Sequence, residues 1–108
     1  MISLRKIISG GQTGADRGGL DAAKALGLEM GGWCPAGRRA EDGRIPAHYP
    51  LTETVTREYK DRTVRNLVMA DATLVCTYGP PGKGSSLTIR ECARFVKPCL
   101  VVDLETDE

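Results

Sequence analysis

The stretch from Ile7 to Asp21, IISGGQTGADRGGLD, constrains the fold of this 108-residue chain more than any other segment. It passes from a short apolar run through paired glycines into a segment with helical spacing. Glycines at such a turn permit a positive φ and let the backbone approach a ligand closely. Leu20, Ala23 and Leu26 then recur at three-residue spacing, as on one face of a helix. We therefore predict a strand over residues 3–9, a glycine loop and a helix whose N-terminus can bind an anion.

The rest of the chain continues this alternation of strands and helices. A continuous β-branched and apolar run over residues 72–78 is typical of a strand that helices bury on both faces. Charged residues in the middle helix are available for its solvent side, Arg62 and Arg65 among them. We predict a strand over 28–34, a long ordered loop over 35–54, a helix over 59–70, a strand over 72–78, a helix capped by Ser85 or Ser86, and a last strand over 99–104.

Alternating strands and helices imply an α/β fold with a parallel sheet and right-handed crossovers. A chain of 108 residues is long enough for one hydrophobic core, so a single domain over residues 1–108 is expected. About four strands are predicted. Their order is 2-1-3-4 if the strand over 3–9 lies beside the strand over 72–78.

A second glycine-rich turn, Gly79-Pro-Pro-Gly-Lys-Gly84, follows the strand over 72–78 and precedes a helix. Strand-to-helix loops of a parallel sheet emerge at one edge, where ligands of such folds bind. The two loops would then line one crevice in which helix N-termini favour a phosphate. Hydroxyl, amide and ammonium donors are available there from Thr13, Ser85, Ser86, Gln12 and Lys83.

The first loop, GGQTGADRGG, matches neither the G-x-G-x-x-G fingerprint nor the G-x-x-x-x-G-K-[ST] P-loop. Ordinary dinucleotide or Mg-NTP binding is therefore not indicated. The alternative explanation is structural: the glycines allow a tight turn and close packing of the helix. Asp16 and Arg17 likewise either complement the helix dipole and face solvent, or fix the loop and contact the ligand.

Composition narrows the classes of partner. Fifteen lysines and arginines against 14 acids give a net charge of +1, which favours neither nucleic acid nor an anionic membrane. We expect a cytoplasmic protein, because no apolar run is long enough for a signal peptide or a membrane span. The four cysteines form no C-x-x-C pair, so reduced, buried thiols are expected. No metal site is predicted, and the single histidine, His48, is interpreted as structural.

Five segments together resemble a known family, the molybdenum cofactor carrier proteins. They are GGQTGADRGGLDAA, GGWCPAGRRAEDGRIP with YPL after it, NLVMADATLV, YGPPGKGSSLT and KPCLVVDL. This family is related to the Lonely Guy phosphoribohydrolases, the proteins once described as lysine decarboxylases. The resemblance spans nearly the whole chain, and the first two segments are long enough to be specific.

The resemblance implies a Rossmann-like three-layer sandwich, a homo-oligomer (dimer or tetramer) and a pocket for molybdopterin or a nucleotide-like phosphate ligand. Members of the family usually continue with a further strand and helix, which this sequence lacks. The third loop reads GPPGKGSS where relatives have a threonine-containing G-G-T core. Carried over by position, the binding residues would be Gly10, Gly11, Gln12, Thr13, Gly14, Ala15, Asp16, Arg38, Arg39, Gly82, Lys83, Gly84, Ser85 and Ser86.

Three functions remain open: a binding protein, a Lonely Guy-type nucleoside 5′-monophosphate phosphoribohydrolase, and a ligand-free interaction domain. The hydrolase motif places a glutamate in the first turn of the helix after the loop. Here Glu91 lies six residues after Ser85, about 9 Å along a helix, which is too far for proton transfer at the loop. We therefore favour binding over catalysis. Gly11→Val or Gly84→Val should remove binding and leave the fold largely intact.

Overall fold

This computed structural model describes residues 3–105 of the chain, which contain three α-helices and eight short strands. The chain divides into two compact units, Met1–Arg62 and Thr63–Glu108, called the first unit and the second unit below. Each unit contains a parallel strand pair with a helix packed against it. The mixed α/β class is confirmed, while a single domain over residues 1–108 stays a prediction.

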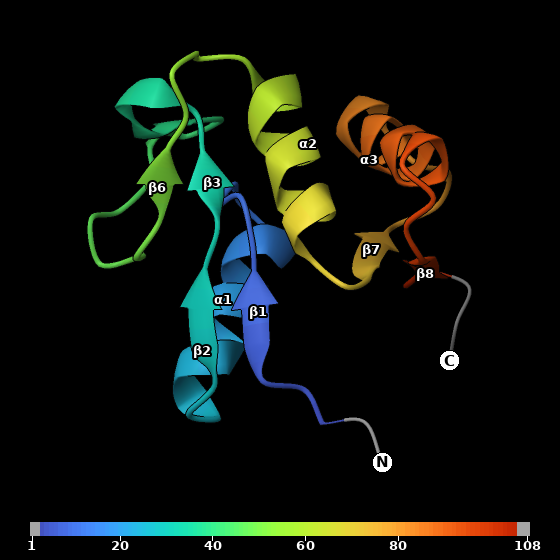
Figure 1. Ribbon diagram of the computed structural model, residues 1–108, viewed down its shortest axis with the longest axis horizontal. Helices are drawn as coiled ribbons and strands as arrows, with labels where there is room; N and C mark the ends of the chain where they lie inside the picture. The colour runs from blue at the N-terminus through green and yellow to red at the C-terminus, as the bar shows by residue number, and fades with distance from the viewer. Residues whose placement is uncertain (1–2, 106–108) are drawn as a thin grey trace. The chain divides into compact units, whose positions relative to one another are not determined.

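The first unit opens with the predicted strand, loop and helix, as β1 (Lys6–Ile8) and α1 (Ala15–Ala25). β1 pairs in parallel with β2 (Glu29–Gly31), and α1 packs against both strands (Figure 1). Leu20 and Ala23 are completely buried, as their spacing predicts. Leu26 is instead 72% exposed, because the helix ends at Ala25 and Leu26 has left the buried face.

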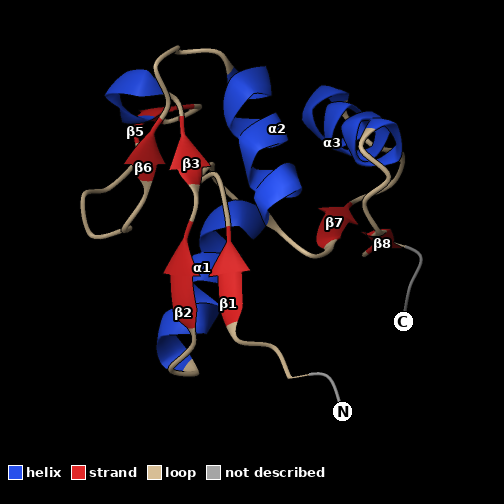
Figure 2. Cartoon of the chain, viewed as in Figure 1, coloured by secondary structure: helices blue, strands red, loops and turns tan. Residues whose placement is uncertain are grey.

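The strand predicted over residues 28–34 is divided in two. Gly32 has φ of 132°, which breaks the extended backbone between β2 and β3. The long loop that follows is more structured than predicted, since it holds a short helix, a hairpin and a strand (Figure 2). They are the 3₁₀ helix η1 (Ala36–Arg38), the hairpin of β4 (Arg39–Ala40) and β5 (Gly43–Arg44), which are antiparallel, and the strand β6 (Thr52–Glu53). β6 pairs in parallel with β3 (Trp33–Cys34), which precedes the loop.

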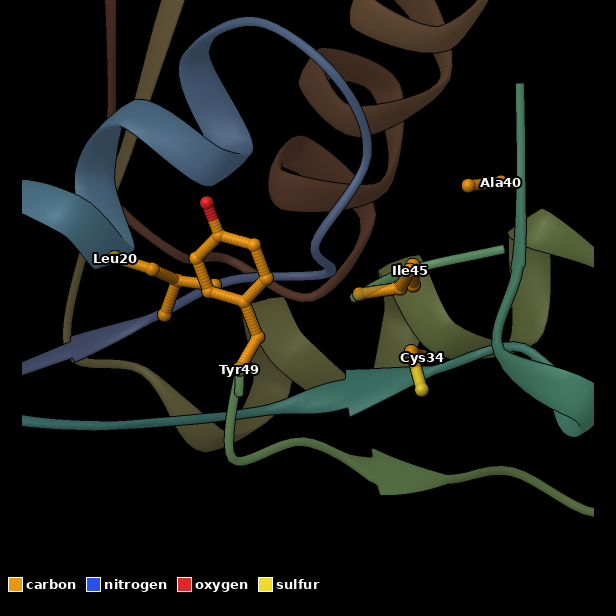
Figure 3. Close-up of a cluster of buried hydrophobic side chains, with 5 residues drawn as sticks. All are labelled: Leu20, Cys34, Ala40, Ile45 and Tyr49. Carbon is orange, nitrogen blue, oxygen red and sulfur yellow. The ribbon is translucent and has the colours of Figure 1, made fainter. Parts of the chain in front are cut away.

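The hydrophobic core of the first unit depends on this long loop. In its central cluster of five buried side chains, only Leu20 comes from α1, and the others come from β3, β4 and the segment after β5 (Figure 3). Met30 and Leu51 pack against the cluster. The segment that the sequence marks as polar therefore covers the helix that carries the glycine loop. The cluster consists of Leu20, Cys34, Ala40, Ile45 and Tyr49.

In the second unit, β7 (Thr73–Thr77) pairs in parallel with β8 (Cys99–Asp103), and α3 (Lys83–Arg94) packs against both. The predicted middle helix is α2 (Tyr59–Met69), whose last residues belong to this unit. None of the helices in residues 3–105 is long and apolar enough to cross a membrane.

Three expectations for the second unit are wrong in detail. Val75 of β7 is buried, but Leu74 is 62% exposed, so β7 is not buried on both faces. Neither predicted serine caps α3, because the helix begins earlier, at Lys83 with Gly82 as its N-cap. Cys99 is an exposed free thiol, since β8 pairs only with β7 among the strands that the structure describes.

Two of the three neighbouring strand pairs in the predicted order are observed. The pairing of β1 with β2 corresponds to strands 1 and 2 of the predicted sheet, and that of β7 with β8 to strands 3 and 4. Both pairs are parallel, as predicted. The complete order 2-1-3-4, which requires β1 beside β7, stays a prediction, and so does the three-layer sandwich.

Candidate functional site

The first glycine loop, Gly10–Asp16, leads from β1 into the N-terminus of α1. Gly11 and Gly14 have φ of 76° and 81°, values that favour glycine over any other residue. Gly14 is the N-cap, and no side chain caps this helix end. Thr13, Gly14 and Ala15 are exposed. The start of α1 therefore lies at the surface of the first unit, and helix N-termini of this kind bind anions in other proteins.

Ser9 and Asp16 hold the loop in shape. The Ser9 hydroxyl donates to the backbone oxygen of Asp16 at 2.8 Å and accepts from the Gly11 N–H at 3.2 Å. The Asp16 carboxylate accepts from the Gln12 N–H, also at 3.2 Å. Of the two interpretations of Asp16, the structure supports the one in which it fixes the loop.

Gln12 joins the loop to the hairpin of β4 and β5. Its side-chain amide donates to the backbone oxygen of Arg39 at 2.9 Å and accepts from the Glu41 N–H at 3.1 Å. Gln12 is buried as a result. Its amide group, predicted as a ligand donor, is thus occupied by the hairpin, while Thr13 beside it stays exposed.

Arg17 makes a second connection to the same hairpin. Two of its nitrogens, Nη1 and Nη2, each donate to an Asp42 carboxylate oxygen at 2.8 Å, and Nε donates to the Gly11 backbone oxygen at 2.9 Å. The paired guanidinium lowers the pKa of Asp42 below its ordinary value, and the carboxylate raises the pKa of Arg17. Arg17 therefore holds the glycine loop and the hairpin together.

The lowered pKa of Asp42 predicts how stability depends on pH. A carboxyl group whose pKa falls on folding stabilises the protein above its unfolded pKa, and this contribution is lost as pH decreases through the folded pKa. We expect Asp42→Asn to lower the melting temperature at pH 7. The difference from the wild type should shrink below about pH 4 and disappear at lower pH. Thermal unfolding of both proteins from pH 7 to pH 2 measures this. A constant difference would contradict the ion pair.

Arg38 has a structural task that the sequence does not reveal. Its Nε donates to the Ile45 backbone oxygen at 3.2 Å, and its Nη2 donates to those of Pro46 and Tyr49 at 2.7 and 2.8 Å. The residue is only 9% exposed and has a positive φ of 55°. Arg38 therefore organises the long loop from inside, and these three donors face protein oxygens.

Arg39, its neighbour, lies on the outside. Its Nη1 donates to the Arg57 backbone oxygen at 3.0 Å, and its guanidinium lies over the Tyr59 ring, with Cζ 4.6 Å from the centroid. Arg39 is exposed, so it is the better ligand candidate of the two predicted arginines.

Arg62 belongs to the site although its position in the sequence indicates a solvent-facing helix residue. Its side chain is only 17% exposed, and its Nη1 lies 3.3 Å from the Asp16 carboxylate. A Cβ atom at Gly10 would collide with the Arg62 guanidinium, whose Cζ would be 2.9 Å away. Helical periodicity assigns Arg62 to the solvent side because it takes no account of Gly10, which is distant in sequence and has no side chain to indicate a contact.

The second glycine loop lies in the second unit, between β7 and α3. Gly79 has φ of 78°, and its N–H donates to the Asp103 carboxylate at 2.9 Å. Gly82 caps α3 without any side-chain hydrogen bond. A Cβ at Gly82 or Gly84 would meet nothing within 4 Å. Lys83, Gly84 and Ser86 are exposed and Ser85 is partly exposed, so this helix start also lies at the surface of its unit.

Glu91, the acid considered for catalysis, lies far along α3 and is buried. It forms an ion pair with Arg94, with 3.4 Å between Nη1 and Oε2. The His48 ring lies beside that of Tyr49, with ring centroids 4.1 Å apart and planes tilted by 38°, and its structural role stays a prediction. Residues 3–105 contain no group of three or more His, Cys, Asp and Glu side chains placed to hold a metal ion.

Strand, glycine loop and helix occur in both units, and they define a mixed α/β protein with a Rossmann-like succession of elements. The chain belongs to the circularly permutated YpsA SLOG family, whose sequence model matches residues 7–108. No curated protein matches the chain.

A solved structure supports the same assignment. It is the 1.45 Å crystal structure of a protein from Syntrophus aciditrophicus SB named "Putative molybdenum carrier protein". The two chains share 46% sequence identity, and their structures superpose with a TM-score of 0.94. The match covers 97% of this chain and 66% of the other, so this chain spans slightly less than two thirds of that protein. The resemblance inferred from the sequence is thereby confirmed.

Proposed function

We propose that this protein binds and carries the molybdenum cofactor, or a related pterin or nucleotide-like ligand, through the phosphate of that ligand. The observation that carries the proposal is the uncapped N-terminus of α1, which follows two positive-φ glycines and is exposed at Thr13 to Ala15. Such helix ends bind phosphates through backbone N–H groups and the helix dipole. The name of the 46% identical relative agrees with a molybdenum-containing ligand.

The predicted residues have different tasks in this proposal. Thr13, Gly14 and Ala15 supply the exposed phosphate-binding backbone and one hydroxyl group. The buried Gly10 and Gly11, together with Gln12, Asp16 and Arg38, shape that backbone and hold it in place. Arg39 supplies an exposed positive charge. In the second unit, Gly82 to Ser86 form a candidate oxyanion site of the same kind. The expectation that the two loops line one crevice stays a prediction.

Native mass spectrometry of the purified protein, with a molybdenum assay, tests the proposal. We expect a bound pterin or nucleotide-like species that carries a phosphate. The same spectra count the subunits, and we propose a homo-oligomer because Leu100 and Val101 of β8 are exposed at 64% and 41%. Added guanosine 5′-monophosphate should bind and be recovered intact. Failure of every phosphate-bearing pterin and nucleotide to bind would refute the carrier proposal, and release of free base would indicate the phosphoribohydrolase instead.

A further inference from the structure

Arg62 occupies an unusual position for a charged residue at the first glycine loop. Its guanidinium rests on the backbone of Gly10, where a Cβ would lie 2.9 Å from Cζ and 3.0 Å from Cδ. Only the absence of a side chain at Gly10 permits this approach. The side chain is 17% exposed, so a cation has been brought from helix α2 onto the loop and largely removed from water.

The hydrogen-bonding capacity of Arg62 is only partly used. A guanidinium has five N–H donors, and burial of unpaired donors is unfavourable. Asp16 accepts from Nη1 at 3.3 Å, and the same carboxylate oxygen, Oδ2, also accepts from the Gln12 N–H. The buried Nε atom has no hydrogen-bond partner within residues 3–105. The pairing is thus long and shared, and Arg62 retains donors for another anion.

A second cation lies close to the first. Both guanidinium groups lie near the Tyr59 ring. The Cζ atom of Arg39 is 4.6 Å from the ring centroid, and the Cζ atom of Arg62 is 5.9 Å from it. An aromatic face attracts guanidinium groups and fixes their position. Two guanidinium groups are therefore held around one ring, and both residues have hydrogen bonds to the loop that opens α1.

We propose that Arg62 recognises the ligand beside the exposed charge of Arg39, by donating to a dianionic tetrahedral oxyanion bound at the start of α1. In the free protein Asp16 holds the guanidinium against Gly10, and the incoming oxyanion takes up donors that Asp16 leaves unused. A phosphate monoester and molybdate share this chemistry. The proposal rests on the proposed function for the location of the site, and it adds a specificity-determining residue and a ligand class.

The test compares four versions of the 108-residue chain: the wild type, Arg62→Lys, Gly10→Ala and the control Arg65→Lys at an exposed position of the same helix. Calorimetric titration uses guanosine 5′-monophosphate, guanosine and molybdate as separate probes. Lysine keeps the charge but loses the planar fork of donors, and a Cβ at Gly10 displaces the unchanged arginine. We expect Arg62→Lys and Gly10→Ala to lower the affinity for the oxyanion about tenfold. Arg65→Lys should bind it with the affinity of the wild type.

Each outcome decides between the proposals. If Arg62→Lys and Gly10→Ala lose the preference for the monophosphate over guanosine, and their ligand-free melting temperatures stay near that of the wild type, Arg62 recognises the phosphate. The same losses with molybdate alone would uphold Arg62 and refute a phosphate-bearing ligand. Unchanged affinity in Arg62→Lys and Gly10→Ala, or an equal loss in Arg65→Lys, would refute the role of Arg62 alone. A wild-type protein that binds neither oxyanion refutes both proposals.

Discussion

Replacement of Gly11 by valine should strongly destabilise the first unit, so that any loss of ligand binding in this variant would reflect the damaged fold. Gly11 has φ of 76°, a conformation that β-branched residues avoid. A Cβ there would lie 2.5 Å from Leu51 Cδ1 and 3.2 Å from Ile45 Cδ1, inside the hydrophobic core. Backbone strain and overpacking together should cost about 3 kcal/mol of unfolding free energy, or roughly 15 °C in melting temperature.

Gly84→Val is the matched control for this substitution. Gly84 lies in the first turn of α3, where an added Cβ meets nothing within 4 Å, and its φ is not positive. Thermal unfolding should therefore show only the small effect of a β-branched residue in a helix, within about 1 kcal/mol. From the sequence we expected both variants to leave the fold intact; from the surroundings of the two glycines in the structure we expect this of Gly84→Val alone. Equal melting temperatures of the two variants would contradict the packing around Gly11.

Arg38→Met should destabilise the protein by a similar amount for a different reason. The substitution keeps much of the buried volume but removes the donors to the backbone oxygens of Ile45, Pro46 and Tyr49. Unpaired buried oxygens cost about 1 kcal/mol or more each, so a loss of about 3 kcal/mol is expected. Because Ile45 and Tyr49 belong to the core, the hairpin and the glycine loop should loosen together.

Denaturant unfolding measures this change, with Arg39→Met as the control on the adjacent, exposed residue. Arg39→Met should leave stability within about 0.5 kcal/mol of the wild type but weaken oxyanion binding, because its charge faces outward near the loop. Arg38→Lys should recover little stability, since an ammonium group cannot reach three divergent oxygens as a planar fork can. If Arg39→Met proves the more destabilising variant, the two arginines have the opposite roles.

Local pattern was sufficient wherever short-range chemistry decides the structure. Helical spacing located α1, α2 and α3, because amphipathic helices are specified by residues three and four apart. Paired glycines after an apolar run located both loops, since a positive φ at Gly11 and Gly79 is a local requirement. The motifs of those loops were also enough to indicate the family that the comparisons confirm.

Prediction failed where a side chain depends on partners that are distant in the sequence. The segment over 35–54 reads as a polar loop, yet Ile45 and Tyr49 in it complete the core around Leu20. Arg38 and Arg39 are adjacent and chemically identical, and only the surrounding carbonyl groups make one of them structural.

The sequence by itself determined the positions of the three helices, the two glycine loops and the family, because these depend on residue type and short spacing. Only the tertiary structure decided which polar groups are free to meet a ligand. It assigned Gln12 and Arg38 to the protein interior and brought Arg62 onto Gly10, 52 positions away in sequence. The physical reason is that a donor's role depends on which acceptors folding places within about 3 Å of it, and spacing along the chain does not carry that information.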